Sequence, residues 1–429
     1  MNRVLILGAG LVTGPIVRYL LDKGYHVTVA SRTLSKAQKL VGDHPNGRAL
    51  AYDIAADADG AGLSGLISQA DLAVSLLPYV YHVQVAKECI AQRKPMVTTS
   101  YVSPAMRELD GPAREAGIII LNEVGVDPGI DHMSAMRVIH RVQNAGGHID
   151  GFMSYCGGLP APEANDNPFG YKFSWSPRGV LLAARNPGHY LKDGKEVFVD
   201  SKDLFKHYWL LPVDGLGEFE AYPNRDAIPY KDLYSISDAA TMYRGTLRNK
   251  GWCDTLDRIV QLGFLSEEPR PASGRTYAEF TRDLLPADAP VTGDVRADVA
   301  SYLGLAPDSP VIQNLAWLGL FDNHPIEGLG ETVSPLDLMT HVMLERMQYR
   351  EGERDMIILV HHFDASYPDG KKEHLTSTLI AYGEPGGDSA MARTVTLPAA
   401  IAVDLILRGE IEAAGVQIPI TPDLYNPIL

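Results

Sequence analysis

The sequence predicts an α/β protein whose first domain is built on a parallel sheet. Short apolar runs alternate with helical stretches from residue 1 to about residue 125, at the spacing of βαβ units. A glycine turn, Gly8-Ala9-Gly10, follows the first apolar run directly. Beyond residue 125 the composition changes. A segment rich in glycine, proline and aromatic residues comes first, and a long segment with helical periodicity follows. We therefore expect a second α/β domain with a helical insertion.

The first βαβ unit has the pattern of a dinucleotide-binding fold. Residues 4–7 read as a strand, a helix-like stretch runs to Leu21, and residues 26–30 read as a second strand. Glycines between strand and helix let the backbone approach a pyrophosphate, which the helix N-terminus attracts. The third glycine of the usual fingerprint is replaced by Thr13, with Gly14 one position later. The order of strand, glycine turn, helix and strand nevertheless predicts a Rossmann-like domain.

The end of the second strand indicates which dinucleotide is bound. It reads Ser31-Arg32-Thr33, where an NAD-binding chain usually has an acid for the ribose 2′-hydroxyl. A guanidinium flanked by hydroxyls suits a 2′-phosphate. We infer NADP(H), the alternative being that Arg32 is a solvated loop residue.

Later elements of the first domain follow in order. Residues 71–78, 95–101 and 118–121 read as strands, and Ser103-Pro104 as the cap and first residue of a helix. Ligands of open parallel sheets lie beyond the carboxyl ends of the strands. The loops that begin at Gly8, Ser31, Leu77, Thr98 and Asn122 should therefore share one crevice.

The rest of the chain divides into segments of different character. Residues 151–230 suit strands joined by long loops, and residues 231–346 show helical periodicity with a cap and proline at Ser334-Pro335. Residues 355–360 and 375–382 read as a hairpin around Asp369-Gly370, and 389–407 as a helix. We expect a dinucleotide domain at 1–125 plus about 389–429, a mixed-sheet domain at 126–230 plus about 350–388, and a helical insertion at about 231–349.

Composition excludes several classes of protein. The 429 residues are 45% hydrophobic and 21% charged, as in ordinary globular proteins. A net charge of -15 and a pI near 5.3 oppose binding to nucleic acid or anionic membranes. We see neither an uninterrupted apolar run of about 18 residues nor a signal peptide. The three cysteines, Cys89, Cys156 and Cys253, lie far apart, and we expect a cytoplasmic enzyme.

Several irregular segments resemble one enzyme family closely. They are SYVSPA (100–105), GVDPGIDH (125–132), SYCGGLPAPE (154–163), NPFGYKFSWSPRG (167–179), YPNRD (222–226) and RGTLR (244–248). Together they resemble saccharopine reductase, the NADP+-dependent, L-glutamate-forming saccharopine dehydrogenase, in order along nearly the whole chain. Asn249 and Trp252-Cys253 depart from the family pattern, so the shape of the substrate can differ slightly.

The resemblance implies an architecture and a reaction. It implies a homodimer of chains with a Rossmann-like domain, a mixed-sheet substrate and dimerisation domain, and an all-helical insertion. The aldehyde of 2-aminoadipate 6-semialdehyde condenses with glutamate, and NADPH reduces the imine to saccharopine. In animals and plants this activity is the second half of a bifunctional chain. Because the dinucleotide motif here starts at residue 8, we expect the other half to be absent.

The resemblance also implies site residues. Those for the cofactor are Gly8, Ala9, Gly10, Leu11, Val12, Ser31, Arg32, Thr33, Asp53, Ile54, Leu77, Thr98, Thr99, Val126, Asp127 and Ser176. Those for the substrate are Ser100, Tyr101, Asp127, Arg225, Thr246, Leu247 and Arg248. Saccharopine carries three carboxylates, and guanidinium is their best bidentate partner in a net-acidic protein. Arg244 and Arg178 are weaker candidates for the same role, and each of these arginines has the alternative of an exposed surface charge.

Exchange of protons at the imine requires at least one titratable group. The candidates are Asp127, Tyr101 and Cys156. Asp127 follows a strand end, but it has the alternative of capping a helix that Pro128 begins. Tyr101 and Cys156 have the alternative of being buried structural residues.

We predict no metal. Asp127, Asp131 and His132 could suggest one, but hydride transfer to an imine needs none, and His361 and His362 must point to opposite faces of a strand. One rival function is an imine reductase resembling carboxynorspermidine dehydrogenase, which would need fewer arginines. Another is an NADP-binding protein without catalysis. The physiological direction and the true amino-acid partner are left open.

Overall fold

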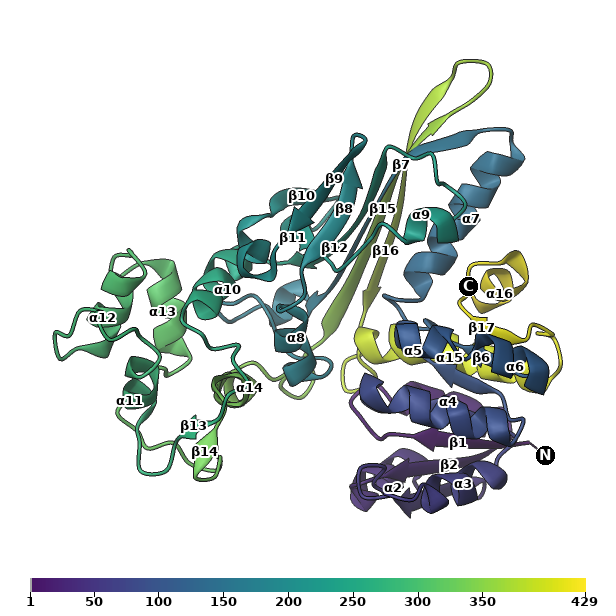
Figure 1. The fold of residues 1–429 in the computed structure, drawn as a ribbon, viewed down its shortest axis with the longest axis horizontal. Coiled ribbons are helices and arrows are strands. Elements are labelled where there is room, and N and C mark those ends of the chain that lie inside the picture. Colours follow the sequence, from purple (N-terminus) through teal and green to yellow (C-terminus); the bar gives the residue numbers. More distant parts are fainter. Residues whose placement is uncertain (1) are drawn as a thin grey trace. The chain divides into compact units, whose positions relative to one another are not determined.

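The computed structural model describes residues 2–429 and forms two compact units. The N-terminal unit comprises the chain up to Ile149, with Ala365–Glu373 and Ala381–Leu429. The central unit comprises Asp150–Asp364 and His374–Ile380. In Figure 1 the yellow C-terminal elements lie with the purple and blue N-terminal ones. The N-terminal unit is therefore assembled from both ends of the chain.

A parallel sheet forms the centre of the N-terminal unit. Its strand order is β17-β6-β5-β4-β1-β2-β3. The strands are β1 Arg3–Leu7, β2 His26–Ser31, β3 Gly47–Ala51, β4 Leu72–Ser75, β5 Met96–Thr98, β6 Ile119–Leu121 and β17 Gly415–Gln417. All neighbouring strands pair in parallel. The order reverses at β1, which pairs with both β2 and β4, so the expected Rossmann-like architecture is confirmed.

Helices cover this sheet with their apolar sides. They are α1 Gly14–Asp22, α2 Leu34–Val41, α3 Ala61–Ser68, η1 Tyr79–Tyr81, α4 His82–Ala91, α5 Pro104–Arg107, α6 Asp110–Ala116, α7 Ile130–Asn144, α15 Ala390–Leu407 and α16 Pro422–Ile428. Helix α1 buries Ile16, Val17 and Leu20, and α15 packs against it. The expected cap at Ser103 is confirmed, because its hydroxyl accepts from Met106 N, and the Ser389 hydroxyl caps α15 in the same way by accepting from Ala392 N.

Helix α15 is long and apolar enough to span a membrane by length and composition alone, with a mean hydropathy of 1.6. However, 61% of this stretch is buried inside the protein. A core helix of this kind passes the same test, so its hydropathy follows from its packing in the N-terminal unit.

A mixed sheet forms the centre of the central unit. Its main strand order is β10-β11-β12-β7-β15-β16, and β8 joins β12 to β9. The strands are β7 His148–Pro160, β8 Gly188–Lys192, β9 Lys195–Val199, β10 Trp209–Val213, β11 Gly217–Pro223, β12 Thr241–Arg248, β15 Asp355–Ser366 and β16 Lys372–Tyr382. β12 pairs in parallel with β7 and antiparallel with β11. The mixed sheet is thus confirmed.

Helices and short elements complete the central unit. They are η2 Pro162–Ala164, α8 Pro177–Ala183, η3 Ser201–Lys206, α9 Tyr230–Leu233, α10 Trp252–Gln261, β13 Arg270–Pro271, α11 Tyr277–Arg282, α12 Val295–Tyr302, α13 Pro310–Trp317, β14 Thr332–Val333 and α14 Pro335–Arg346. Figure 1 shows α11, α12 and α13 grouped at one end of this unit. Ser334 caps α14 as expected, its hydroxyl accepting from Asp337 N.

The helical segment begins later than its periodicity predicted. Strand β12 lies inside the range expected to be helical, and helices dominate only from Trp252 onward. β12 contains Arg244, Gly245 and Arg248, and these residues replace the apolar alternation by which a strand is recognised. The compact units divide at residue 149, and the expected division into three domains stays a prediction.

Candidate active site

The carboxyl edge of the parallel sheet brings five predicted loops to one side. Strands β1, β2, β4, β5 and β6 run in the same direction, so the loops after them all emerge at this edge. These loops begin at Gly8, Ser31, Leu77, Thr98 and Asn122, as the sequence predicted. Every predicted cofactor residue except Ser176 lies at the end of a strand of this sheet or in the loop after one.

The turn of residues 8–12 fits a pyrophosphate. Gly8 has φ +114°, and a Cβ there would lie 2.7 Å from the Leu76 carbonyl oxygen, so the close passage between β1 and β4 requires glycine. A Cβ at Gly10 would meet no atom within 4 Å, which leaves the backbone open to a ligand. Thr13, in place of the third glycine, is completely buried, and its hydroxyl accepts from Gly10 N at 3.0 Å. Thr13 thus stabilises the turn, whose other residues are Ala9, Leu11 and Val12.

The end of β2 fits a phosphorylated ribose. The Arg32 and Thr33 side chains are exposed, and Thr33 N donates to Ser31 Oγ at 3.3 Å. An exposed guanidinium beside two hydroxyls provides donors for a phosphate. Asp53 makes a turn, since its Oδ1 accepts from Ala55 N at 3.1 Å, and Ile54 is buried.

The predicted nicotinamide side combines buried scaffold with partly exposed residues. Thr98 is 1% exposed, and its hydroxyl donates to the Ser75 carbonyl at 2.9 Å, so it fastens β5 to β4. Leu77 and Thr99 are half-buried, whereas Val126 is buried. Ser176 belongs to the central unit, where it is exposed and caps α8 by accepting from Gly179 N at 3.2 Å.

Tyr101 and Asp127 form a hydrogen-bonded pair. The Tyr101 hydroxyl donates to Asp127 Oδ1 at 2.8 Å, and both side chains are half-buried. The interpretation of Asp127 as a helix cap is wrong, because α7 begins at Ile130 and its cap residue is Gly129. The tyrosine proton therefore orients and stabilises a carboxylate that stays partly accessible.

A buried Glu123–His132 pair supports the loop of Tyr101. Glu123 Oε1 accepts from Val102 N at 2.9 Å, and its Oε2 lies 2.6 Å from His132 Nε2. His132 is completely buried and Glu123 is 4% exposed. The pair therefore connects the segment after β5 to the first turn of α7.

The turn of residues 125–129 holds Asp127 at its tip. Gly125 N donates to the Pro128 carbonyl at 2.9 Å, and Ile130 N donates to the Gly125 carbonyl at 2.8 Å. Gly129 has φ +149°, and a Cβ there would lie 2.0 Å from the Gly125 oxygen. Only glycine allows this turn to close.

In the central unit, one face of the mixed sheet carries predicted site residues. Thr246 of β12 lies opposite Cys156 of β7 and opposite Tyr222 of β11. Because side chains alternate along a strand, Arg244 and Arg248 share the face of Thr246. Leu247 points to the opposite face and is completely buried. Of the three consecutive predicted residues, Leu247 could thus contact a substrate only through its backbone.

Arg248 is a buried guanidinium between two aromatic rings. It is 7% exposed and lies 4.9 Å from the Tyr171 ring centre and 5.3 Å from that of Trp252. Its Nη1 donates to the Leu247 carbonyl at 2.8 Å, while its Nε has no partner. Within residues 2–429 no carboxylate forms an ion pair with it. Burial raises the pKa of the Tyr222 hydroxyl nearby to about 12, so this hydroxyl stays protonated at neutral pH.

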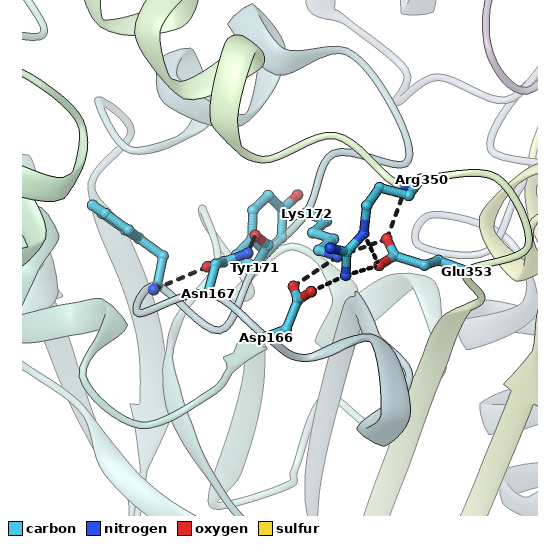
Figure 2. Close-up of polar contacts among 7 residues, drawn as sticks. Asp166, Asn167, Tyr171, Lys172, Arg350 and Glu353 are labelled. Atoms are coloured by element: carbon cyan, nitrogen blue, oxygen red, sulfur yellow. Dashed lines mark hydrogen bonds and ion pairs between the residues drawn. The ribbon is translucent and has the colours of Figure 1, made fainter.

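An ion-pair cluster fixes the loop that contains Tyr171. Lys172 is 3% exposed, and its Nζ lies 2.8 Å from Asp166 Oδ1 and 2.6 Å from Glu353 Oε2. Figure 2 shows Lys172 between these carboxylates, with Arg350 bonded to both. The cluster therefore holds Tyr171 against Arg248.

Two further hydrogen bonds stabilise the same loop, one within it and one from the residue that follows β12. Asn167 Nδ2 donates to the Tyr171 carbonyl at 2.8 Å, a bond drawn in Figure 2. Asn249 Nδ2 donates to the Gly170 carbonyl at 2.7 Å. The departure from the family pattern at Asn249 thus lies on a residue that joins this loop to the end of β12.

Arg225 is presented by a tight backbone turn after β11. It is exposed and has φ +59°, a left-handed conformation that is uncommon outside glycine. Its carbonyl accepts from His189 N at 2.9 Å, and the preceding Asn224 N donates to the Arg244 carbonyl at 2.9 Å. Two strands thus hold a strained arginine, an arrangement typical of functional positions.

The two weaker arginine candidates differ. Arg244 is 3% exposed and stacks 4.4 Å from the Tyr230 ring centre. Arg178 pairs with Glu267 at 2.8 Å and with Asp337 at 3.0 Å, so its guanidinium already has two carboxylates. The geometry thus gives Arg178 a structural contact instead of an open anion site.

The histidines of β15 lie on opposite faces, as expected. His361 is 1% exposed and packs on Phe152 and Phe363, whereas His362 stacks with His374. Over the described part of the chain, no three His, Cys, Asp or Glu residues are placed to hold a metal ion.

Sequence reasoning missed residues that support the site from behind. His82, Glu123 and Lys172 are all buried and polar, but none was singled out for a role. Lys172 had the clearest signal, since it stands between Tyr171 and Phe173 in an aromatic segment. A lysine there must find carboxylates if the segment is buried. His82 and Glu123 had no comparable signal.

Comparisons with known proteins agree over the whole chain. Residues 4–121 match the family model "Saccharopine dehydrogenase NADP binding domain", and residues 125–429 match "Saccharopine dehydrogenase C-terminal domain". The saccharopine dehydrogenase [NADP(+), L-glutamate-forming] of Pyricularia oryzae is 43% identical over 99% of this chain and 95% of its own. That of Schizosaccharomyces pombe is 42% identical over 100% of this chain and 96% of its own.

A solved structure and a longer relative extend the comparison. The apo saccharopine dehydrogenase (L-Glu forming) of Saccharomyces cerevisiae has a TM-score of 0.87 and 40% identity, over 100% of this chain and 96% of the other. The mitochondrial alpha-aminoadipic semialdehyde synthase of Bos taurus is 38% identical, and the match spans 46% of its length. With both family models and full-length relatives in agreement, the chain belongs to the saccharopine dehydrogenase family.

Proposed function

We propose that this protein is an NADP(H)-dependent saccharopine dehydrogenase of lysine metabolism. It interconverts saccharopine with 2-aminoadipate 6-semialdehyde and L-glutamate. The names of the full-length relatives, which are 42 to 43% identical to this chain, support both the NADP cofactor and the L-glutamate-forming reaction. The exposed Arg32 at the end of β2 supports the preference for a phosphorylated dinucleotide.

The observation that carries the proposal is the buried guanidinium of Arg248. A buried charge is stable only when an opposite charge or enough hydrogen bonds compensate it. Arg248 has two aromatic rings and one carbonyl, and no carboxylate within residues 2–429. A substrate with three carboxylates supplies the missing negative charge. The exposed, conformationally restrained Arg225 is the second cation that we assign to this substrate.

The reaction balances without a metal. In the oxidative direction a hydride leaves the carbon next to the secondary amine of saccharopine, and the amine nitrogen loses its proton to give an imine. Water adds to the imine carbon, and the carbon–nitrogen bond then breaks to release glutamate and the aldehyde. NADP+ bound at the carboxyl edge of the parallel sheet would supply the hydride acceptor, so the protein's own residues must bind the substrate and exchange protons.

The Tyr101–Asp127 pair is our candidate for proton exchange. Asp127 is half-buried, and its Oδ1 accepts a hydrogen bond from the Tyr101 hydroxyl at 2.8 Å. A carboxylate held in this way can take a proton from the attacking water and return it to the leaving amine. Cys156, 9% exposed and opposite Thr246, is the less accessible candidate.

Two further parts of the proposal concern the cell and the assembly. We propose a homodimer and a cytoplasmic location, as the family resemblance and the three widely spaced cysteines suggest. Sedimentation of the purified protein tests the first, and fractionation of the source cells tests the second.

The decisive experiment is a coupled assay of the purified protein. We expect NADPH to appear with saccharopine and NADP+, glutamate to be released in equal amount, and NAD+ to be a much poorer cofactor. Protein that consumes another amine and aldehyde pair, but not saccharopine, would be an imine reductase of different specificity. Binding of NADPH without any turnover would make it a non-catalytic protein.

A further inference from the structure

His82 is a buried histidine that connects two serines behind the predicted substrate site. It begins α4 and is 4% exposed. Its Nδ1 lies 2.8 Å from Ser75 Oγ, at the end of β4, and its Nε2 lies 2.8 Å from Ser100 Oγ, just after β5. All three residues belong to the N-terminal unit. The buried ring therefore contacts Ser100 from the interior of the N-terminal unit. Ser100 is a residue that we expect to contact the substrate.

The His82 ring is neutral at physiological pH. Burial lowers its pKa to about 4, and no carboxylate is hydrogen-bonded to it in the described chain. A neutral imidazole has one N–H donor and one acceptor nitrogen. The two serines must therefore differ in role, one donating to the ring and the other accepting from it.

Thr98 favours one of the two positions for the ring hydrogen. Its hydroxyl donates to the Ser75 carbonyl at 2.9 Å, so its single hydrogen is already used. The Thr98 oxygen also lies 3.5 Å from His82 Nε2, where it can only accept. This contact favours the tautomer with the hydrogen on Nε2, in which Nδ1 accepts from the Ser75 hydroxyl.

We propose that His82 is a positioning residue that directs the Ser100 hydroxyl hydrogen toward a carboxylate of the substrate. Nε2–H donates to Ser100 Oγ, so the Ser100 hydrogen is left for a ligand. An oxygen that already accepts from a donor is also the better donor to an anion. This inference rests on the proposed function, because it assigns the ligand of Ser100 to a carboxylate of saccharopine.

Two substitutions at His82 separate this role from packing. In His82→Gln the amide lies near the position of Nε2 and can still donate to Ser100. In His82→Asn the amide lies near Nδ1 and reaches only Ser75. We expect His82→Asn to raise the KM for saccharopine roughly tenfold and His82→Gln to raise it much less, the loss of one directed bond to an anion being the cause.

A double-variant cycle tests whether His82 acts through Ser100. If it does, His82→Asn should add nothing to the KM of Ser100→Ala, so the double variant should match Ser100→Ala alone. The affinity for NADPH, measured by fluorescence, should change much less than the KM for saccharopine. Ser75→Ala tests the relay if His82→Asn does not fold. Without the Ser75 hydroxyl nothing donates to Nδ1, so the ring is held less firmly against Ser100, and the KM for saccharopine should rise by about threefold.

Each failure has its own signature. An unchanged KM for saccharopine in folded His82→Asn would overturn the assignment of His82, as would effects of His82→Asn and Ser100→Ala that multiply. Equal losses in His82→Asn and His82→Gln would make the ring a packing residue. A wild-type protein that does not oxidise saccharopine would overturn the proposed function itself, whatever the variants do.

Discussion

Arg32 is exposed at the end of β2, and its contribution can be measured on its own. We expect Arg32→Asp to weaken NADPH binding by about 1.5 to 3 kcal/mol, the value of a hydrogen bond to a charged group. Fluorescence titration with NADPH and NADH measures it. Arg48→Asp, on the neighbouring strand β3, is the matched control, because it makes the same change of charge at an exposed arginine. Equal effects of the two would mean that Arg32 acts only through net charge.

Arg225 gives a second prediction for a single residue. We expect Arg225→Ala to raise the KM for saccharopine far more than the KM for NADP+, since a carboxylate loses its guanidinium partner. Initial rates at varied concentrations of each compound measure both constants. Arg185→Ala is the control, because Arg185 is exposed in the same unit and pairs with Glu267. A similar rise in both constants for Arg225→Ala would contradict its role at the substrate.

Individual residues differ in how far the sequence could assign them. Gly8 and Arg32 belong to the dinucleotide-binding motif, whose spacing is set by contacts to the pyrophosphate and the ribose. Their positions could therefore be predicted from the sequence pattern. Arg178 matched the same family segment as Ser176, but its Glu267 and Asp337 partners lie 89 and 159 residues away. No local pattern can show such a contact. His82 was missed for the same reason, because its partners come from two other strand ends.

At the level of elements, the Lys172 cluster joins the loop of Tyr171 to the segment before β15. We expect Lys172→Met to cost about 3 kcal/mol of unfolding free energy, because it leaves a mostly buried Glu353 without its buried cation. Urea unfolding at pH 7 measures it. The control is Lys371→Met, since Lys371 pairs with Glu373 at an exposed hairpin and should cost little.

The effect of Lys172→Met should depend on pH in one direction. Burial alone raises the pKa of Glu353, but hydrogen bonds from Lys172 and Arg350 outweigh it, so the pKa lies below the ordinary value. A carboxyl with a lowered pKa stabilises the fold above its unfolded pKa, and this contribution disappears as the pH falls through the folded value. The difference between wild type and Lys172→Met should therefore shrink as the pH falls below about 4.5. A difference that grows toward acid would contradict this.

The turn of residues 125–129 is a second element with a sharp steric requirement. We expect Gly129→Ala to cost about 3 kcal/mol of unfolding free energy, because its Cβ would overlap the Gly125 backbone. Gly146→Ala, just beyond the other end of α7, is the control. Gly146 also has a positive φ but has open space around it, so the cost should be about 1 kcal/mol. Equal costs in urea unfolding would show that the overlap is relieved elsewhere.

Elements with regular apolar patterns were predicted well, and those with site residues were not. β1 and β4 are buried at nearly every position and read as continuous apolar runs, and β2 alternates Val with more polar residues, so these three strands followed from the sequence. β12 did not, because it has arginines where a strand buried on both faces would have apolar residues. The arginines that we assign to the substrate interrupt the apolar pattern of β12, so hydrophobic periodicity does not predict this strand.

At the level of the whole molecule, cofactor binding should stabilise the fold selectively. A ligand that binds only the folded state raises the free energy of unfolding, by about 2.7 kcal/mol at one hundred times its Kd. We expect NADPH at that concentration to raise the melting temperature clearly, and NADH at the same concentration to raise it much less. Calorimetry of the full chain measures both. Equal shifts would contradict the specificity assigned to the end of β2.

Assembly of the N-terminal unit from both ends of the chain has a consequence for biosynthesis. β17 completes the sheet by pairing with β6, and α15 packs on α1, but both are translated only after the central unit. A nascent chain on the ribosome therefore exposes an unpaired sheet edge and the apolar side of α1 while the central unit is made. During this interval chaperones can protect the open sheet edge. A chain that ends at a stop codon before β17 should aggregate, although its nucleotide-binding motif is intact.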